Sequence, residues 1–195
     1  MTGTLIVVGS APCLYDDLKK ALELRPFAAV MLVNGACTSI EQADHMLSGH
    51  TVKAEQFVAA RKKAFPDASP IRVHANWAKR SSRPEKELPS VTDWHGAEMS
   101  TGATSIAKGA RIGLRALGFD EIILCGAPMD GSGYAGTEAV VRHDCRRIGD
   151  PNHQGHRTIE GYRAKFARLA ESEFKGKVFS MSGFTRDCLG EPGRE

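Results

Sequence analysis

The side chains with the clearest capacity for acid–base chemistry lie in one irregular stretch of the carboxyl-terminal half. It holds three histidines together with aspartate and cysteine side chains: His143, His153, His156, Asp144, Asp150 and Cys145. An imidazole titrates near neutral pH, so one positioned histidine can accept or donate a proton during a reaction. We favour His156, because it comes directly before a helical pattern. A metal site is the weaker alternative, since His153-x-x-His156 lacks the i, i+4 pairing of a helical zinc site, and exposed loop histidines are a third interpretation.

Two short polar turns provide candidate ligand-binding residues. Gly9 and Ser10 follow an apolar run at residues 5–8, and Asn34 follows another at residues 29–33. Such runs predict buried strands of a parallel sheet, and ligands of open parallel sheets bind beyond the carboxyl ends of the strands. The first turn has neither the GxGxxG nor the P-loop spacing, and Asp16 and Asp17 after it would repel a closely held phosphate. A structural turn is therefore an equal alternative for this segment.

The hydroxyl-rich segment at residues 100–105 is a third candidate. Its last two hydroxyls, Thr104 and Ser105, stand at the start of the strongest amphipathic helix pattern in the chain. Unpaired N–H groups at a helix N-terminus are satisfied either by a capping side chain or by a bound anion. Capping uses one hydroxyl, so the surplus of hydroxyls here favours a bound phosphate.

Basic residues gather near the histidines, at Arg142, Arg146, Arg147 and Arg157. They could screen the phosphates of a ligand, and a solvated surface is the alternative of equal weight. The formal net charge is only +3, so we expect no nucleic-acid partner.

The apolar pattern predicts the elements that would bring these residues together. Strands are expected at residues 5–8, 29–33, 71–75, 121–126 and 177–181, with a strand or loop at 43–47. Apolar residues recur at helical spacing over 14–22, 54–65, 106–117 and 159–169. This alternation predicts an α/β, Rossmann-like three-layer fold with a mainly parallel sheet and helices on both faces. Gly109 and Gly113 should let one helix approach the sheet closely, and irregular loops are expected at about 78–100 and 127–157.

The composition is typical of a soluble globular protein. With 195 residues, 42% of them hydrophobic and 25% charged, the chain has the material for one well-filled core, so we expect a single domain over residues 1–195. We see no apolar run of about 18 residues and no secretion signal, which favours a cytoplasmic protein without a membrane segment. The five cysteines are scattered and never form Cys-x-x-Cys, so neither a disulfide framework nor a zinc ribbon is expected.

The order of these motifs resembles the bacterial sialyltransferases that use a CMP-activated sugar, and the related archaeal 6-hydroxymethylpterin pyrophosphokinases. Residues 9–14 are similar to their opening Gly-x-Gly-Pro-Ser-Leu turn, with Ala11 and Cys13 as departures. Asn34 matches the asparagine after their second strand, and residues 117–122 match a Leu-Gly-Tyr/Phe-x-Glu-Ile strand entry. The sequence Gly-His-Arg at residues 155–157 stands where the sialyltransferases have a Gly-His-Ser loop.

The resemblance implies a nucleotide-dependent transferase of glycosyltransferase type with a CMP-sugar or related donor. His156 would be the general base toward the acceptor hydroxyl, and the nucleotide contacts would be Gly9, Ser10, Asn34, Thr104 and Ser105. The first alternative is an ATP-dependent pyrophosphokinase that holds Mg²⁺ through Asp130 and Asp144. The second is a non-catalytic binding or assembly protein, since small bacteriophage and prophage proteins also share this pattern.

Overall fold

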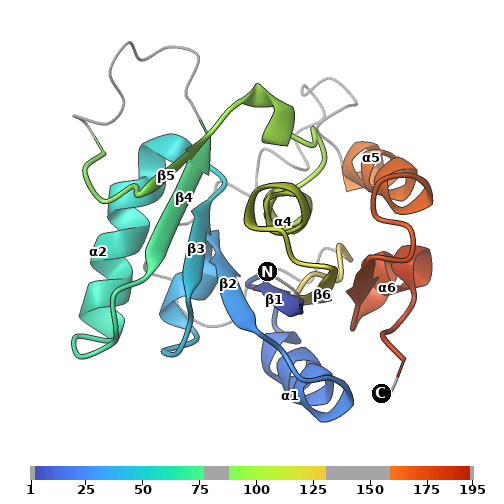
Figure 1. Cartoon of the computed structure of the whole chain (residues 1–195), viewed down its shortest axis with the longest axis horizontal. Coiled ribbons are helices and arrows are strands. Elements are labelled where there is room, and N and C mark those ends of the chain that lie inside the picture. Colours follow the sequence, from blue (N-terminus) through green and yellow to red (C-terminus); the bar gives the residue numbers. More distant parts are fainter. Residues whose placement is uncertain (1–2, 77–87, 131–158, 194–195) are drawn as a thin grey trace.

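The apolar runs of the sequence become the central strands of one parallel sheet (Figure 1). In this computed structural model, which describes residues 3–76, 88–130 and 159–193, the sheet has seven strands in the order β5-β4-β3-β2-β1-β6-β7. Every strand pairs parallel to its neighbour. The strands are β1 (Thr4–Val8), β2 (Ala29–Val33), β3 (His45–Ser48), β4 (Arg72–Asn76), β5 (Asp93–His95), β6 (Glu121–Cys125) and β7 (Val178–Ser180).

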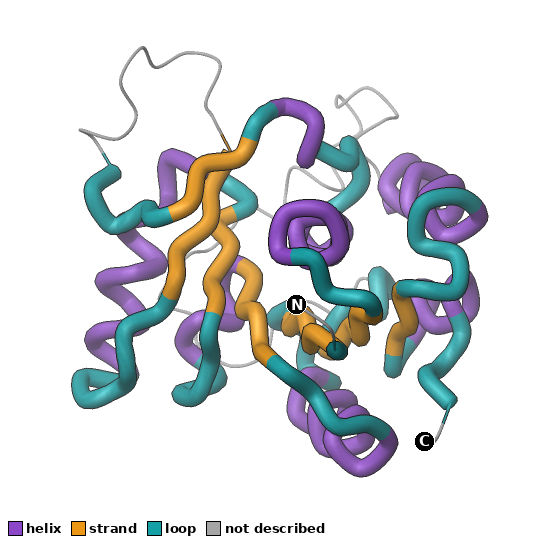
Figure 2. Tube along the Cα trace, in the orientation of Figure 1, coloured by secondary structure: helices purple, strands orange, loops and turns teal. Residues whose placement is uncertain are grey.

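Helices cover both faces of this sheet, as expected for a doubly wound α/β fold (Figures 1 and 2). On one face, α1 (Leu14–Leu24) packs on β1, β2 and β6, and α2 (Ala54–Ala64) packs on β3 and β4. On the other face, α4 (Ser105–Ile112) and α5 (Ile159–Glu171) enclose the largest apolar cluster. The short helix α6 (Gly183–Leu189) follows β7. The predicted Rossmann-like, three-layer α/β fold is therefore confirmed.

The close approach of α4 to the sheet, predicted from two glycines, is also confirmed. A Cβ at Gly109 would lie 2.9 Å from Cγ1 of Val7, and a Cβ at Gly113 would lie 2.7 Å from Cδ2 of Leu5. Gly113 begins a wider π-type turn, η4 (Gly113–Leu117), and Gly118 ends it with a φ of 73°. A left-handed φ suits glycine at the end of a helix.

One local prediction was wrong. The stretch expected to be a loop at 78–100 contains β5 and the 3₁₀ turn η3 (Ala97–Met99), because a three-residue polar strand at a sheet edge leaves no apolar period. The segment after β7, for which the apolar pattern makes no prediction, contains α6, whose seven residues are too few for a helical pattern. Thr51 begins the 3₁₀ turn η2 (Thr51–Lys53) before α2, and its hydroxyl donates to the carbonyl of Asn76 at 2.7 Å.

The turns after β1 and β6 are in direct backbone contact. The amide of Gly9 donates to the carbonyl of Cys125 at 2.8 Å, and the amide of Ala11 donates to the carbonyl of Gly126 at 3.2 Å. A Cβ at Gly9 would collide with the carbonyl oxygen of Gly126. The chain crosses from the β5 side of the sheet to the β6 side at this point, which is the topological switch where ligands of such folds bind.

Replacing Gly9 by alanine should therefore destabilise the whole domain. Because both partners in the collision are backbone, one turn must move, and we expect a loss of roughly 2 to 3 kcal/mol in the free energy of unfolding. The measurement is urea denaturation of Gly9→Ala beside Gly193→Ala, a position with no atom within 4 Å of an added Cβ. Equal midpoints for the two variants would show that the turns are not interlocked.

Candidate functional site

Three strand ends and one helix start meet beside the switch point. Asn34 follows β2 in a left-handed conformation with a φ of 52°, which asparagine adopts more readily than most residues. Its side-chain Oδ1 accepts a hydrogen bond of 2.7 Å from the amide of Gly49, the first residue after β3. Ser10, from the turn after β1, approaches Gly35, since a Cβ built there would lie 3.7 Å from Oγ of Ser10. The turns after β1, β2 and β3 thus form one continuous rim.

Ser105 brings the N-terminus of α4 to this rim. A Cβ at Gly49 would overlap Oγ of Ser105 and lie 2.5 Å from its Cβ. Gly49 is therefore needed for the helix start to reach the turn after β3. Sequence reasoning missed Gly49, although a glycine directly after a buried strand is a usable signal for close backbone approach.

The other hydroxyls of residues 100–105 are partly used within the chain. Thr104 is the N-cap of α4, and its Oγ1 accepts from the amide of Ala107 at 3.3 Å. Thr101 accepts from the amide of Ala103 at 3.2 Å. The alternative of a self-capping helix therefore accounts for Thr104, whereas the Ser105 hydroxyl lies against Gly49 outside the cap.

Lys108 is a candidate site residue that sequence reasoning did not single out. Its Nζ donates to the carbonyl of Gly49 at 3.4 Å, three residues along α4 from Ser105. Burial lowers the pKa of this ammonium. A partly buried cation stands beside the rim, where it can contact an anionic group of a ligand. The sequence does offer a signal for Lys108. It stands three residues after Ser105, so both lie on one side of the predicted helix.

Asp17, which we expected to repel a phosphate held closely at the first turn, faces the protein interior instead. Its side chain is buried, and Oδ2 accepts from the amide of Gly126 at 2.8 Å and from the hydroxyl of Ser182 at 2.6 Å. The thiol of Cys13 lies 3.5 Å from the same oxygen, and burial is the main cause that raises its pKa. This carboxylate therefore joins α1 to the turns after β6 and β7.

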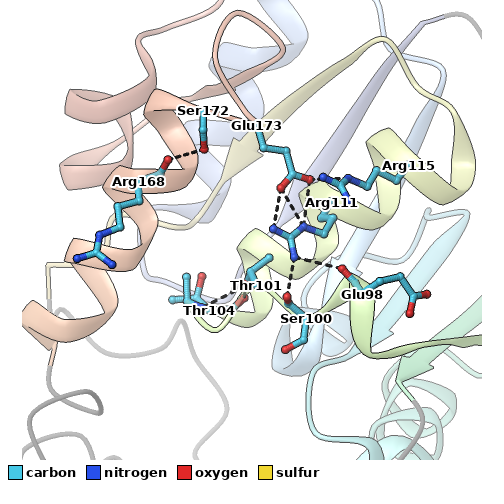
Figure 3. Close-up of polar contacts among 10 residues, drawn as sticks. Glu98, Ser100, Thr101, Thr104, Arg111, Arg115, Arg168, Ser172 and Glu173 are labelled. Atoms are coloured by element: carbon cyan, nitrogen blue, oxygen red, sulfur yellow. Dashed lines mark hydrogen bonds and ion pairs between the residues drawn. The ribbon is translucent and has the colours of Figure 1, made fainter.

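An arginine clamp holds the segment that leads into α4 (Figure 3). Arg111 donates to both carboxylate oxygens of Glu173, at 2.6 Å from its NH2 group, and to the carbonyl of Ser100 at 2.6 Å. Arg115 also pairs with Glu173, at 2.8 Å. The side chains of Arg111 and Glu173 are only 12% and 15% exposed, so this contact is partly shielded from solvent. The clamp fixes the entry to α4 and hence the position of Ser105.

Several predicted site residues lie outside the described residues. These are His156, Asp144 and the four arginines Arg142, Arg146, Arg147 and Arg157. Asp130 is described and exposed, a few residues beyond β6. Within residues 3–76, 88–130 and 159–193, no group of three or more His, Cys, Asp or Glu could hold a metal ion. In the same ranges, no helix has the length and apolar character to cross a membrane.

Comparisons with known proteins show the same fold in glycosyltransferases. No family model and no curated protein sequence matches the chain. The structure is similar to the sialyltransferase CstII from Campylobacter jejuni, solved in complex with cytidine-5'-monophosphate, with a TM-score of 0.63 and 13% identity over 97% of this chain and 84% of that one. It is also similar to the MAf glycosyltransferase from Magnetospirillum magneticum AMB-1, with a TM-score of 0.53 and 18% identity. There the match covers 93% of this chain and 32% of that one.

Arg111→Met should lower the stability of the domain by about 2 kcal/mol, because Glu173 and the carbonyl of Ser100 lose a partly buried cationic donor. Arg186→Met is the matched control, since its ion pair with Glu191 is 44% and 50% exposed and should contribute little. Urea unfolding measures both variants. A loss no larger for Arg111→Met than for Arg186→Met would mean that the clamp is only a surface contact.

Proposed function

We propose that this chain is a nucleotide-dependent glycosyltransferase that uses a CMP-sugar or a related donor, with the nucleotide bound at the rim formed by Gly9, Ser10, Asn34 and Ser105. The observation that carries this proposal is the convergence of Ser10, Asn34 and Ser105 at the switch point of a sheet. The sequence had singled out each of these residues separately. The likeness to a sialyltransferase fold solved with CMP supports the choice of nucleotide.

The chemistry of the rim suits a nucleoside monophosphate. Because Oδ1 of Asn34 is held by the amide of Gly49, its Nδ2 is the end that can donate to oxygen atoms of a ligand. Ser10 supplies a hydroxyl from the turn after β1. The N-terminus of α4 favours a phosphate through its N–H groups, and Ser105 and Lys108 add a hydroxyl and a positive charge there.

In this proposal the reaction itself depends on His156. Its imidazole would take the proton of the acceptor hydroxyl while that oxygen attacks the anomeric carbon of the donor sugar. The bond from the sugar to the phosphate would break, and CMP would leave with the electron pair. Arg142, Arg146, Arg147 and Arg157 would offset the charge of the phosphate. Thr104 would contribute to phosphate binding indirectly, because it caps the N-terminus of α4 where the phosphate would bind.

CMP should raise the melting temperature of the protein more than UMP or ATP with magnesium does. Saturation at about 100 times the dissociation constant corresponds to roughly 2.7 kcal/mol of stabilisation. Ser105→Ala should weaken CMP binding about tenfold, the equivalent of one hydrogen bond to a charged group. Ser172→Ala is the control, because the hydroxyl of Ser172 donates only to the carbonyl of Arg168 and is exposed.

A shift with ATP and magnesium in place of CMP would instead select the pyrophosphokinase alternative. No shift with any nucleotide would indicate a binding or assembly protein that retains the fold without the chemistry. Either result contradicts the proposed donor.

His156→Ala should abolish transfer while leaving CMP affinity within about twofold, because a general base contributes to the transition state rather than to nucleotide binding. CMP release from a CMP-sugar and calorimetric CMP titration measure the two effects on the same protein. If the variant keeps its turnover, another group is the base. If it loses CMP affinity instead, His156 is a binding residue.

A further inference from the structure

Three histidines on neighbouring strands form a hydrogen-bonded row that the proposed nucleotide site does not use. Nδ1 of His45 lies 3.0 Å from Nε2 of His74, and Nδ1 of His74 lies 3.0 Å from Nε2 of His95. His74 stands opposite Leu47 in the β3–β4 register, two residues beyond His45. His95 stands opposite Asn76, again two residues farther along. The row therefore runs diagonally across the sheet to the carboxyl edge of β5.

The row begins in the interior and ends where the sheet meets solvent. His45 is 4% exposed and His74 is fully buried, whereas His95 is half-buried. The three rings lie on the face of the sheet that carries Leu47, which is the α4 side. This is the side from which Ser105 and Lys108 reach the rim.

Hydrogen-bond stoichiometry couples the three rings. A neutral imidazole has one N–H donor and one acceptor nitrogen, so both links are made only when all three rings donate in the same direction. When His95 donates through Nε2 toward His74, its Nδ1 is a hydrogen-bond acceptor. When the row donates in the opposite direction, from His45 toward His95, Nδ1 of His95 is a donor. The outer ring can therefore present either character to a ligand while the row stays uncharged.

Burial disfavours the charged form of all three rings, so the row is mainly neutral at neutral pH. Burial lowers the pKa of His45, His74 and His95, most strongly for His74. Asp93 acts against this on all three rings, joined by Asp44 at His45 and by Glu98 at His95. Arg72 opposes protonation of all three, and it pairs with Asp93 at 2.5 Å, which offsets much of the negative charge.

One buried acceptor, Oδ1 of Asn76, lies beside the outer end of the row. Asn76 is 9% exposed, and its Nδ2 donates to the carbonyl of Gly96 at 3.2 Å. Its Oδ1 is buried and has no hydrogen-bond partner among the described residues. Leaving such an oxygen unpaired destabilises the folded protein, and a donor group of a ligand would relieve this.

We propose that Asn76 and His95 form a subsite for a polyhydroxylated, uncharged ligand at the carboxyl edge of β4 and β5. One hydroxyl would donate to Oδ1 of Asn76, and a neighbouring hydroxyl would donate to or accept from Nδ1 of His95. His74 and His45 are positioning residues that set the direction of the row. No covalent step is involved.

This inference rests on the proposed function, because it identifies the subsite with the sugar end of the glycosyltransferase crevice. Asn34 directly follows β2, and Asn76 and His95 end β4 and β5, so the subsite stands two to three strand spacings from Asn34. At about 4.8 Å per spacing this is roughly 10 to 14 Å along the same edge. A nucleotide bound at the rim could extend its sugar toward this position.

The test is an NMR titration of the full chain with labelled histidine and asparagine side chains. The probes are the methyl glycosides of glucose, galactose, mannose and N-acetylglucosamine. We expect a saturable shift of the His95 imidazole nitrogens and of the Asn76 amide with at least one of them, with the His74 and His45 signals moving along the same binding curve.

Variants separate the subsite from the row behind it. Asn76→Leu should abolish the glycoside shifts, whereas His74→Phe should leave a weaker shift at His95 and none at His45. Trp94→Phe is the control, because Trp94 lies between Asp93 and His95 on β5 but packs on the opposite apolar cluster. No saturable shift with any glycoside, or unchanged shifts in Asn76→Leu, would overturn the subsite.

Titration of the same samples with CMP distinguishes failure of this inference from failure of the proposed function. Glycoside shifts without a CMP response would leave the subsite standing and contradict the nucleotide site. A CMP response at Asn34 without glycoside shifts at His95 would contradict the subsite alone.

Discussion

The backbones of the turns after β1 and β6 cross within hydrogen-bonding distance, and the rest of the site depends on this contact. The carbonyl of Gly126 occupies the space that a side chain at residue 9 would take. Gly126 itself has a φ of 62°, and a Cβ there would lie 2.6 Å from Cβ of Leu14, the first residue of α1. Two residues without side chains thus fix where the first helix starts.

Asp17 links the contact between these turns to neighbouring elements of the fold. A buried carboxylate is expensive unless its oxygens accept hydrogen bonds, and here one oxygen accepts from both Gly126 and Ser182. Ser182 is the N-cap residue of α6, so a single acidic side chain relates α1, β6 and the end of β7. An acidic residue in the first turn of a helix is also favoured by the helix dipole. Its sequence position thus predicts a helix start, but not that the carboxylate faces inward.

The sequence predicted those parts of the fold that depend on apolar periodicity. The runs that form β1, β2 and β6 are fully apolar or nearly so, and they are buried on both faces of the sheet. The histidine row was not predictable in this way, because His45, His74 and His95 are 29 and 21 residues apart. Only the register of three strands places their rings side by side. Gly49 was missed for a related reason. Its role depends on a tertiary contact with Ser105, which lies far away in the sequence.

The two faces of the β3–β4 region have opposite chemistry. One face is apolar and is covered by α2, and the other carries buried polar side chains. Met46 and Val73 point toward α2 and belong to a closed apolar cluster with Phe57. On the other face the same strands place His45, His74 and Asn76, all of them buried polar residues. Polar groups weaken a purely structural core because each needs a partner, and the oxygen of Asn76 has none among the described residues. Where α4 packs directly on this same side of the sheet, β1 and β2 instead present aliphatic residues such as Val7 and Val33. Apolar packing therefore does not explain the buried polar groups on this face, whereas the subsite that we propose at Asn76 and His95 would account for them.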